Sequence, residues 1–156
     1  MTKRRALLAV LTAGLLSTAL TTPAQAAAFD NGTYPNATRP GGGAACNQNS
    51  AWIASRPVQN ELGQTVTTVD VYYSYSCATN WIRVQSNPGG GLAAKSIWVD
   101  GGTVFNEPDY GYGSSFTKQV YAPGATCVNF QVHLYDTAGR SVGETYTAGA
   151  NHQRIC

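Results

Sequence analysis

Two segments of the chain alternate apolar and polar side chains with a period of two residues. Their apolar positions are Val69, Val71, Tyr73 and Tyr75 in the first segment and Val128, Phe130, Val132 and Leu134 in the second. A period of two is typical of antiparallel strands that bury one face. No segment after residue 26 has the spacing of an amphipathic helix. The alternation therefore predicts an all-β fold.

Turn-forming residues divide the chain into short extended segments. The stretches 100–102 (DGG) and 136–140 (DTAGR) each separate two such segments and predict hairpins, because glycine adopts positive φ without strain. Residues 106–115 (NEPDYGYGSS) are expected to form a long loop. Roughly eight strands with turns about every 8–12 residues indicate a small β-sandwich or barrel of antiparallel strands.

The chain has four cysteines, and their even number predicts a disulfide framework in an exported protein. Spacing alone leaves three connectivities open. We expect Cys46–Cys77 and Cys127–Cys156, because each of these pairings closes a local loop within one half of the chain. The four cysteines therefore predict a domain that is cross-linked by two disulfides.

The first 26 residues have the composition of a secretory signal. A basic start (Lys3, Arg4 and Arg5) precedes an apolar run at 6–20, and Ala24-Gln25-Ala26 supplies small residues for cleavage. We therefore expect a signal peptide at 1–26, a flexible N-terminal lead-in at 27–45 and a single β domain at 46–156. The mature protein would be secreted and extracellular, with no membrane insertion after cleavage. The lead-in could be a tether, or it could dock onto a partner as an added strand.

Removal of the signal changes the charge balance. Three of the ten Lys and Arg residues lie within it, which leaves seven cations against eight Asp and Glu residues, a net charge of −1. Nucleic-acid binding requires a cluster of cations that neutralises phosphates. We therefore expect no nucleic-acid partner.

No catalytic constellation stands out in the sequence. His133, three residues before Asp136, is a candidate base for a hydrolase, but no G-x-S-x-G turn marks a serine nucleophile. Glu107 and Asp109 are too close in sequence to flank a sugar from opposite sides. The chain lacks a C-x-x-C pair and a calcium-loop pattern. We expect no metal and no cofactor, and we favour a non-enzymatic role.

The predicted loop at 106–115 is the candidate binding surface. Tyr110 and Tyr112 flank a glycine and would offer amphipathic contact area, with Glu107 and Asp109 beside them. The two tyrosines could instead cap an open end of the fold. The segment 72–84 (YYSYSCATNWIRV) is expected to form strand, connection and strand. Its aromatic side chains would lie mostly in the core, and Arg83 would pair with Asp70 across the strands.

Part of this region resembles a domain of unknown function found in exported actinobacterial proteins. The family has an early cysteine and a Tyr-Ser-x-x-Cys-x-x-x-Trp core followed by x-Arg-Val/Ile. The matching residues, within roughly 46–99, are Cys46, Tyr75, Ser76, Cys77, Trp81 and Arg83, although the spacing from Tyr75 to Cys77 is shorter than in the family. Taking Tyr73 and Ser74 instead restores the spacing of the family. The resemblance implies export and a similar fold, and it lends no catalytic residues.

The features together predict a secreted binding or adaptor module that contacts an extracellular protein. Small secreted adaptors of actinobacterial antagonistic toxin assemblies are similar in size and style. A cell-wall polysaccharide-binding module is the alternative. A small secreted hydrolase and a protease inhibitor are further alternatives.

Overall fold

The computed structural model describes residues 29–145 and 152–156 of the chain. These residues contain ten strands and one 3₁₀ helix. The expected signal peptide lies outside these residues. The elements are η1 (Cys46–Asn49), β1 (Ser50–Gln59), β2 (Thr65–Ser74), β3 (Thr79–Val84), β4 (Gly90–Val99), β5 (Phe105–Tyr110), β6 (Ser115–Phe116), β7 (Val120–Tyr121), β8 (Val128–Asp136), β9 (Ser141–Glu144) and β10 (Gln153–Ile155). Within the described residues, no helix is long and apolar enough to cross a membrane.

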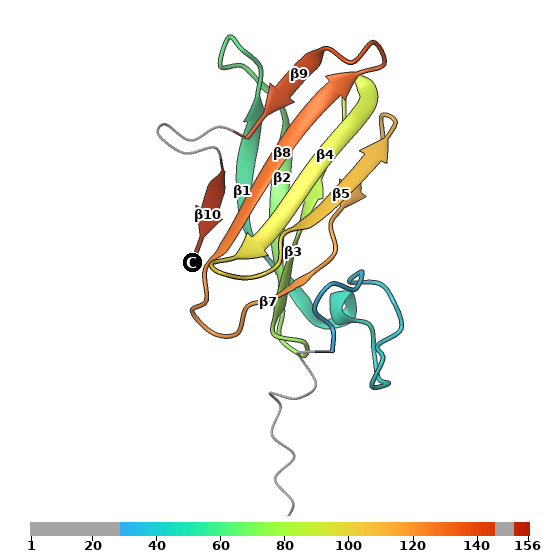
Figure 1. Cartoon of the computed structure of the whole chain (residues 1–156), viewed down its shortest axis with the longest axis vertical. Coiled ribbons are helices and arrows are strands. Elements are labelled where there is room, and N and C mark those ends of the chain that lie inside the picture. The colour runs from blue at the N-terminus through green and yellow to red at the C-terminus, as the bar shows by residue number, and fades with distance from the viewer. Residues whose placement is uncertain (1–28, 146–151) are drawn as a thin grey trace, which may run out of the picture.

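The strands form a nearly closed antiparallel barrel (Figure 1). Eight of them follow the order β5-β4-β8-β9-β1-β2-β3-β6, while β10 pairs with β8 and β7 pairs with β3. The predicted all-β fold of about eight antiparallel strands is confirmed, and it is a barrel. The path begins at β5 and ends at β6, so these two strands flank a gap that we call the seam.

The inward positions of the strands fill the barrel. Four residues of the predicted buried face of β8 (Val128, Phe130, Val132 and Leu134) are almost completely inaccessible, as are Val69 and Val71 of β2. The prediction for β2 is wrong at its end. Tyr75 is 65% exposed because β2 stops at Ser74 and the chain then turns toward Cys77. Alternation determines the core only while the backbone remains extended.

Both predicted disulfides are confirmed, Cys46–Cys77 and Cys127–Cys156. The first ties η1 to the turn between β2 and β3, and the second ties the start of β8 to the chain end after β10. Each bridge adds about 2–4 kcal/mol to stability by restricting the unfolded chain.

The two predicted hairpins are present, but the predicted loop at 106–115 is largely wrong. Residues 105–110 form β5, which pairs with β4 from Leu92↔Tyr110 to Ile97↔Phe105. Ser115 begins β6, so the turn itself comprises only residues 111–114. Proline and glycine in this stretch suggested a loop, yet an edge strand accepts proline because one side of it has no hydrogen-bonded neighbour.

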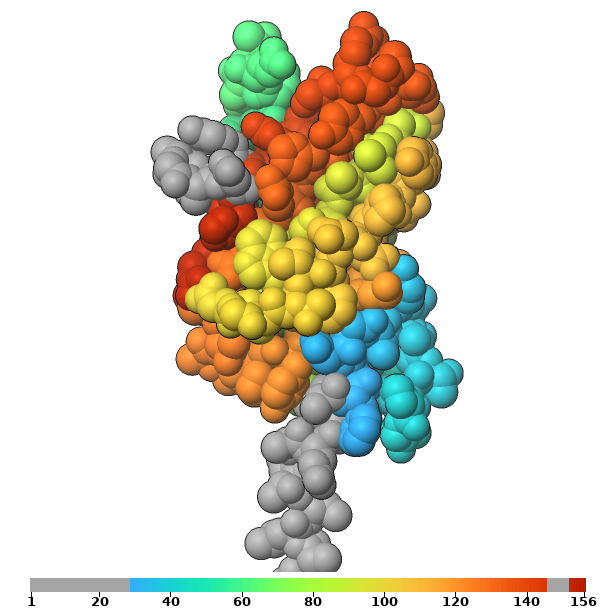
Figure 2. Space-filling model, viewed as in Figure 1, coloured from blue at the N-terminus to red at the C-terminus, as the bar shows by residue number. Residues whose placement is uncertain are grey.

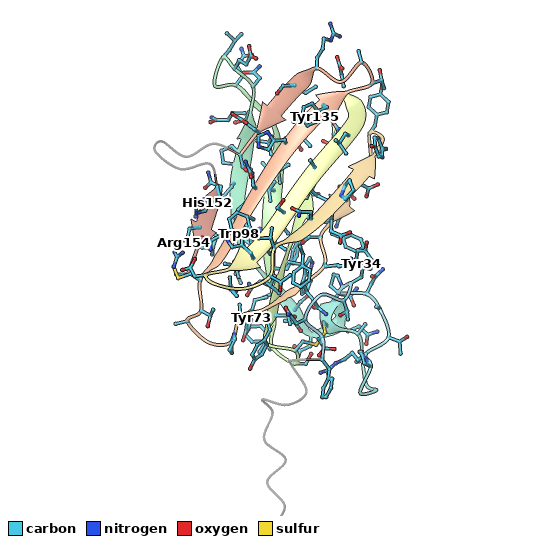
Figure 3. The ribbon with its side chains drawn as sticks, in the orientation of Figure 1. Tyr34, Tyr73, Trp98, Tyr135, His152 and Arg154 are labelled. Atoms are coloured by element: carbon cyan, nitrogen blue, oxygen red, sulfur yellow. A yellow bond between two sulfur atoms is a disulfide. The ribbon has the colours of Figure 1, made fainter. Side chains whose placement is uncertain are left out.

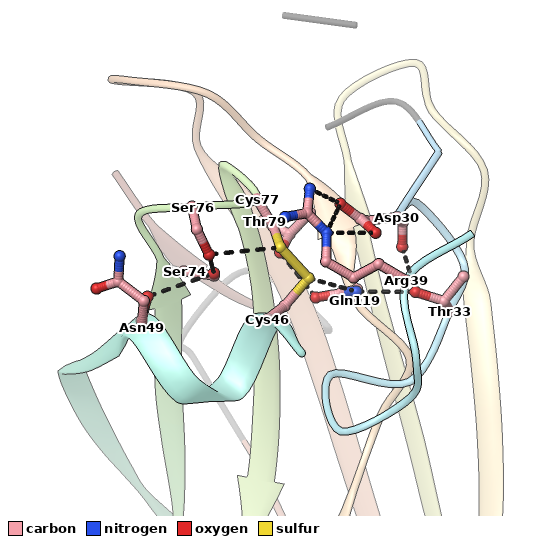
Figure 4. A network of polar contacts seen from close by, with 10 residues as sticks. All are labelled: Asp30, Thr33, Arg39, Cys46, Asn49, Ser74, Ser76, Cys77, Thr79 and Gln119. Carbon is pink, nitrogen blue, oxygen red and sulfur yellow. Dashed lines mark hydrogen bonds and ion pairs between the residues drawn. A yellow bond between two sulfur atoms is a disulfide. The ribbon is translucent and has the colours of Figure 1, made fainter. Parts of the chain in front are cut away.

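The lead-in from residue 29 has no helix or strand, and it is held against the barrel (Figure 2). Gly32 N donates to Gln119 O at 2.8 Å, and Gln119 N donates to Thr33 O at 2.9 Å. The carboxylate of Asp30 is 1% exposed and accepts three hydrogen bonds from Arg39 (Figure 4). These contacts lie beside the Cys46–Cys77 bridge. The described part of the lead-in is therefore anchored to the domain.

Candidate functional site

Polar side chains close the seam between β5 and β6. Lys95 of β4 points into the barrel, where its side chain is fully buried and Nζ donates to Ser115 Oγ at 2.8 Å. The nearest carboxylate oxygen is Asp109 Oδ2, 4.0 Å away. Burial lowers the pKa of Lys95, because the charged amine has lost its hydration, although Asp109 and Glu107 oppose the shift.

Glu107 occupies the other half of the seam and is 8% exposed. Tyr34 Oη donates to its carboxylate at 2.6 Å, and Lys118 Nζ lies 3.0 Å from it (Figure 3 labels Tyr34, which belongs to the lead-in). The hydrogen bond with Glu107 raises the pKa of both Tyr34 and Lys118. Glu107, which we expected in a binding loop, instead joins the lead-in to the barrel.

The other three predicted binding residues are accessible. The side chain of Asp109 is 56% exposed, and Tyr110 and Tyr112 are 77% and 68% exposed. The two tyrosines therefore do not cap the open end of the fold by burial. We call Tyr110, Tyr112 and Tyr135 with the glycine run 89–91 the tyrosine tip.

Tyr112 is exposed but not free to move in every direction. Its ring lies so close to Gly90 that a Cβ built there would be 2.3 Å from Cζ, and Gly90 has a φ of +68°. A hollow of about 470 Å³ adjoins it, with Leu92, Tyr110 and Tyr135 in its lining. The tip thus combines one aromatic ring seated against the backbone, that of Tyr112, with a largely apolar depression.

Asn87, which is 1% exposed, fixes the backbone of the tip. Its backbone N–H donates to Tyr112 O at 3.3 Å, and its side-chain amide donates to Gly91 O at 3.0 Å and to Tyr135 O at 3.2 Å. One buried residue thus holds the turn after β5, the start of β4 and the end of β8. The tyrosines project from a fixed base.

A second concave surface lies on the outer face of β1, β2 and β3. Trp52 is in register with Tyr72, and Tyr72 with Trp81, so the three side chains lie on the same face. The Tyr72 and Trp81 rings are stacked, with centroids 5.6 Å apart and an interplanar angle of 8°. Phe116 lies nearby and meets the edge of Tyr34 at 6.0 Å.

Tyr72, Trp81 and Phe116 border a hollow of about 390 Å³ that we call the aromatic groove, and Trp52 lies beside Tyr72 on the neighbouring strand. The groove is lined by Pro35, Asn36, Asn47, Ser50, Tyr72, Trp81, Arg83, Ser114 and Phe116. The backbone N–H of Asn47 donates to Pro35 O at 2.9 Å, which joins the lead-in and η1 into one wall. Segments far apart in sequence therefore build this groove.

The sequence interpretation missed this groove. Trp81 is 5% exposed, but it packs on Tyr72 at the outer face rather than in the barrel interior. Arg83 does lie opposite Asp70, as expected, yet the predicted ion pair is wrong. Arg83 donates to Ser114 Oγ at 2.9 Å, and Asp70 accepts a hydrogen bond from Gln85. The sequence signal that could have indicated the groove was an aromatic side chain at an outward-facing position of a strand.

The arrangement around His133 does not form a serine triad. His133 Nδ1 lies 3.1 Å from Glu144 Oε2, and Nε2 lies 2.7 Å from Gln131 Nε2. The carboxylate of Asp136 is bonded to Arg140 instead. Among the described residues, no serine is hydrogen-bonded to this histidine, so the geometry gives the hydrolase alternative no support.

One cluster has the residue types of a metal site but a different chemistry. Asp30, Cys46 and Cys77 place potential ligand atoms within 4.8 Å of one another. Metals bind cysteine as the thiolate, and both sulfurs are in a disulfide. Arg39 already occupies the Asp30 carboxylate. The cluster is therefore a structural anchor (Figure 4).

The fold and its two exposed aromatic surfaces define a disulfide-stapled β-barrel with candidate binding sites. No family model, curated protein or solved structure matches the chain.

Proposed function

We propose that the protein is a secreted, non-enzymatic binding or adaptor module that contacts an extracellular protein through the tyrosine tip. The observation that carries the proposal is the seating of Tyr112 on Gly90 while 68% of the side chain stays exposed. An aromatic side chain held in place before binding loses little conformational entropy when a partner covers it.

The surroundings of the tip favour a protein as the partner. The hollow beside Tyr110 has room for an apolar side chain, and its lining includes the glycine backbone of Gly90 and Gly91. Tyrosine is enriched in protein–protein contact regions because it combines an apolar ring with a polar hydroxyl. A partner side chain in this hollow would be flanked by Tyr110 and Tyr135.

Export is part of the proposal. The basic and apolar character of residues 1–26 supports it, and two disulfides are typical of proteins that fold in an oxidising compartment. The resemblance to exported actinobacterial domains supports export, and a similarity in size and style to small secreted adaptors is the basis for proposing a role in an antagonistic toxin assembly.

A quantitative pull-down tests the proposal. The signal-cleaved protein is immobilised and exposed to native culture medium, and the bound proteins are compared between wild type and Tyr110→Ala/Tyr112→Ala. We expect a defined protein to be retained by the wild type and reduced about tenfold by the double variant, as the loss of two aromatic contacts implies.

Leu62→Ala is the matched control. Leu62 is 81% exposed in the turn between β1 and β2, so this variant also removes an exposed apolar side chain. It should leave retention unchanged. Equal retention by wild type and the double tyrosine variant would refute the tip as the binding surface.

A further inference from the structure

We propose that the aromatic groove is a second binding site, and that its ligand is a neutral polysaccharide built of pyranose rings. The site does not use the tyrosine tip. Tyr135 lies near one end of the barrel and Tyr34, beside the groove, lies toward the other (Figure 3). A module with both sites could hold a protein partner and a sugar chain together.

An exposed tryptophan begins the aromatic platform. Trp52 is 60% exposed on a ten-residue strand, and Tyr72 and Trp81 follow it across the next two strands. Trp81 is nearly inaccessible and stacks against the Tyr72 ring. The apolar C–H face of a pyranose ring fits against an aromatic face, whose π-electrons attract the weakly positive hydrogens. The platform thus offers stacking surface.

The rim supplies hydrogen-bonding groups for sugar hydroxyls. The side-chain amides of Asn36 and Asn47 are exposed and make no hydrogen bond to the described residues. An amide can donate and accept at once, which matches the dual character of a hydroxyl group. Arg83 adds further donors while Ser114 holds it in place.

The charge of the groove favours a neutral chain over a polyanion. Arg83 is the only charged residue in its lining. An adjoining hollow of about 410 Å³ shares Asn36, Ser114 and Phe116 with the groove, and its lining also includes Glu107, Asp109 and the fully buried Lys95. A polyanion binds by neutralising several charges with accessible cations, and in this hollow the two carboxylates outnumber the single lysine. The shared lining extends the space available to a chain of sugars.

The backbone around the groove disfavours an extended peptide as the ligand. β2 pairs with β1 and β3, and β3 pairs with β2 on one side and with β6 and β7 on the other. A peptide that adds a strand needs an unpaired edge. The platform strands offer side chains rather than free backbone groups.

Sedimentation with insoluble polymers tests the site. The disulfide-bonded, signal-cleaved protein is mixed with cellulose, chitin, starch granules and, as a polyanion, calcium pectate. Binding isotherms are measured for wild type, Trp52→Ala, Asn47→Ala and the control Leu62→Ala. We expect binding to at least one neutral polymer, weakened about tenfold by Trp52→Ala and severalfold by Asn47→Ala. Leu62→Ala should bind like the wild type, and about 0.5 M NaCl should have little effect.

Three results would overturn the proposal. They are the absence of binding to every neutral polymer, binding to pectate alone, and an unchanged isotherm for Trp52→Ala. Trp52 and Asn47 are exposed, so both variants should fold, and a thermal unfolding scan verifies this. Because Trp52 lies outside the tyrosine tip, failure here would leave the protein-partner test unaffected.

Discussion

Lys95 Nζ and Ser115 Oγ are 2.8 Å apart across the gap between β5 and β6. A lysine side chain is otherwise among the least frequently buried groups, and this one has no exposed surface. Ser115 and the more distant Ala93 O, at 3.5 Å, are its hydrogen-bond acceptors. The amine therefore depends on the seam for the partners that water would otherwise provide.

Replacement of Ser115 should destabilise the protein more than its size suggests. Ser115→Ala leaves the Lys95 amine under-solvated, so we expect a loss of about 1–3 kcal/mol in the free energy of unfolding. Lys95→Met/Ser115→Ala should recover much of this loss, because no buried charge then remains. Denaturant unfolding of wild type, Lys95→Met, Ser115→Ala and the double variant measures the coupling free energy between the two side chains. Additive losses would show that the contact is incidental.

Stability should rise with pH in a way that depends on Lys95. Its pKa in the folded protein lies below 10.5, the ordinary value for lysine. At pH values between the folded pKa and 10.5, the unfolded chain therefore binds more protons than the folded one. The penalty for burying the charged amine is complete below the folded pKa and disappears as pH approaches 10.5. The stability difference between Lys95→Met and wild type should therefore shrink from pH 7 toward pH 10. Subtracting the Met variant removes the opposite contribution of Tyr34, whose pKa is raised.

Glu107 and Asp109 should respond differently to loss of charge. Glu107→Gln weakens the bonds from Tyr34 and Lys118 in a buried setting, and we expect a cost of about 1–2 kcal/mol. Asp109→Asn, at an exposed position, should stay within about 0.5 kcal/mol. Thermal unfolding of the two variants at neutral pH gives the comparison. Equal effects would contradict a structural role for Glu107 in joining the lead-in to the barrel.

Gly90→Ala should disturb the tyrosine tip. The added methyl group would overlap the Tyr112 ring, and the backbone at position 90 has a φ of +68°, which alanine rarely adopts. Gly101→Ala is a matched control, since Gly101 has a φ of +70° and nothing within 4 Å of its Cβ position. The backbone cost of about 1 kcal/mol is common to both. Only Gly90→Ala should also shift the Tyr112 ring signals in NMR spectra and reduce partner retention. Identical spectra at Tyr112 would show that its ring is not seated on Gly90.

The strands, hairpins and disulfides could be predicted because local patterns determine them. The alternation at 128–134 identifies an inward face directly, and each cysteine pair closes a short loop. The seam could not be predicted in this way. Position 95 shares its inward face with Ala93 and Ile97, but only closure of the barrel brings it next to Ser115, twenty residues later. The same holds for Glu107, whose partner Tyr34 is 73 residues away.

The tyrosine tip and the aromatic groove were harder to predict from the sequence than the seam. Tyr110 and Tyr112 could be singled out because glycine flanks them, although the strand that carries Tyr110 was mistaken for loop. The groove depends on the lead-in, whose Pro35 and Asn36 show no periodic pattern. Its position follows from hydrogen bonds to Gln119 and from the bridge at Cys46, which are contacts between distant segments.

The pairing of β1 with β9 has a mechanical consequence. In the described chain it consists of one residue pair, Gln59↔Glu144, and the seam lies on the other side of the barrel. Each disulfide lies within one of the two half-sheets thus delimited, so neither disulfide links the halves, which are joined covalently only by the polypeptide segments between strands. Each half-sheet is cross-linked by its own disulfide, whereas the β1–β9 contact between the half-sheets is not cross-linked. A pulling force applied across that contact would separate the two half-sheets before it unfolds either of them.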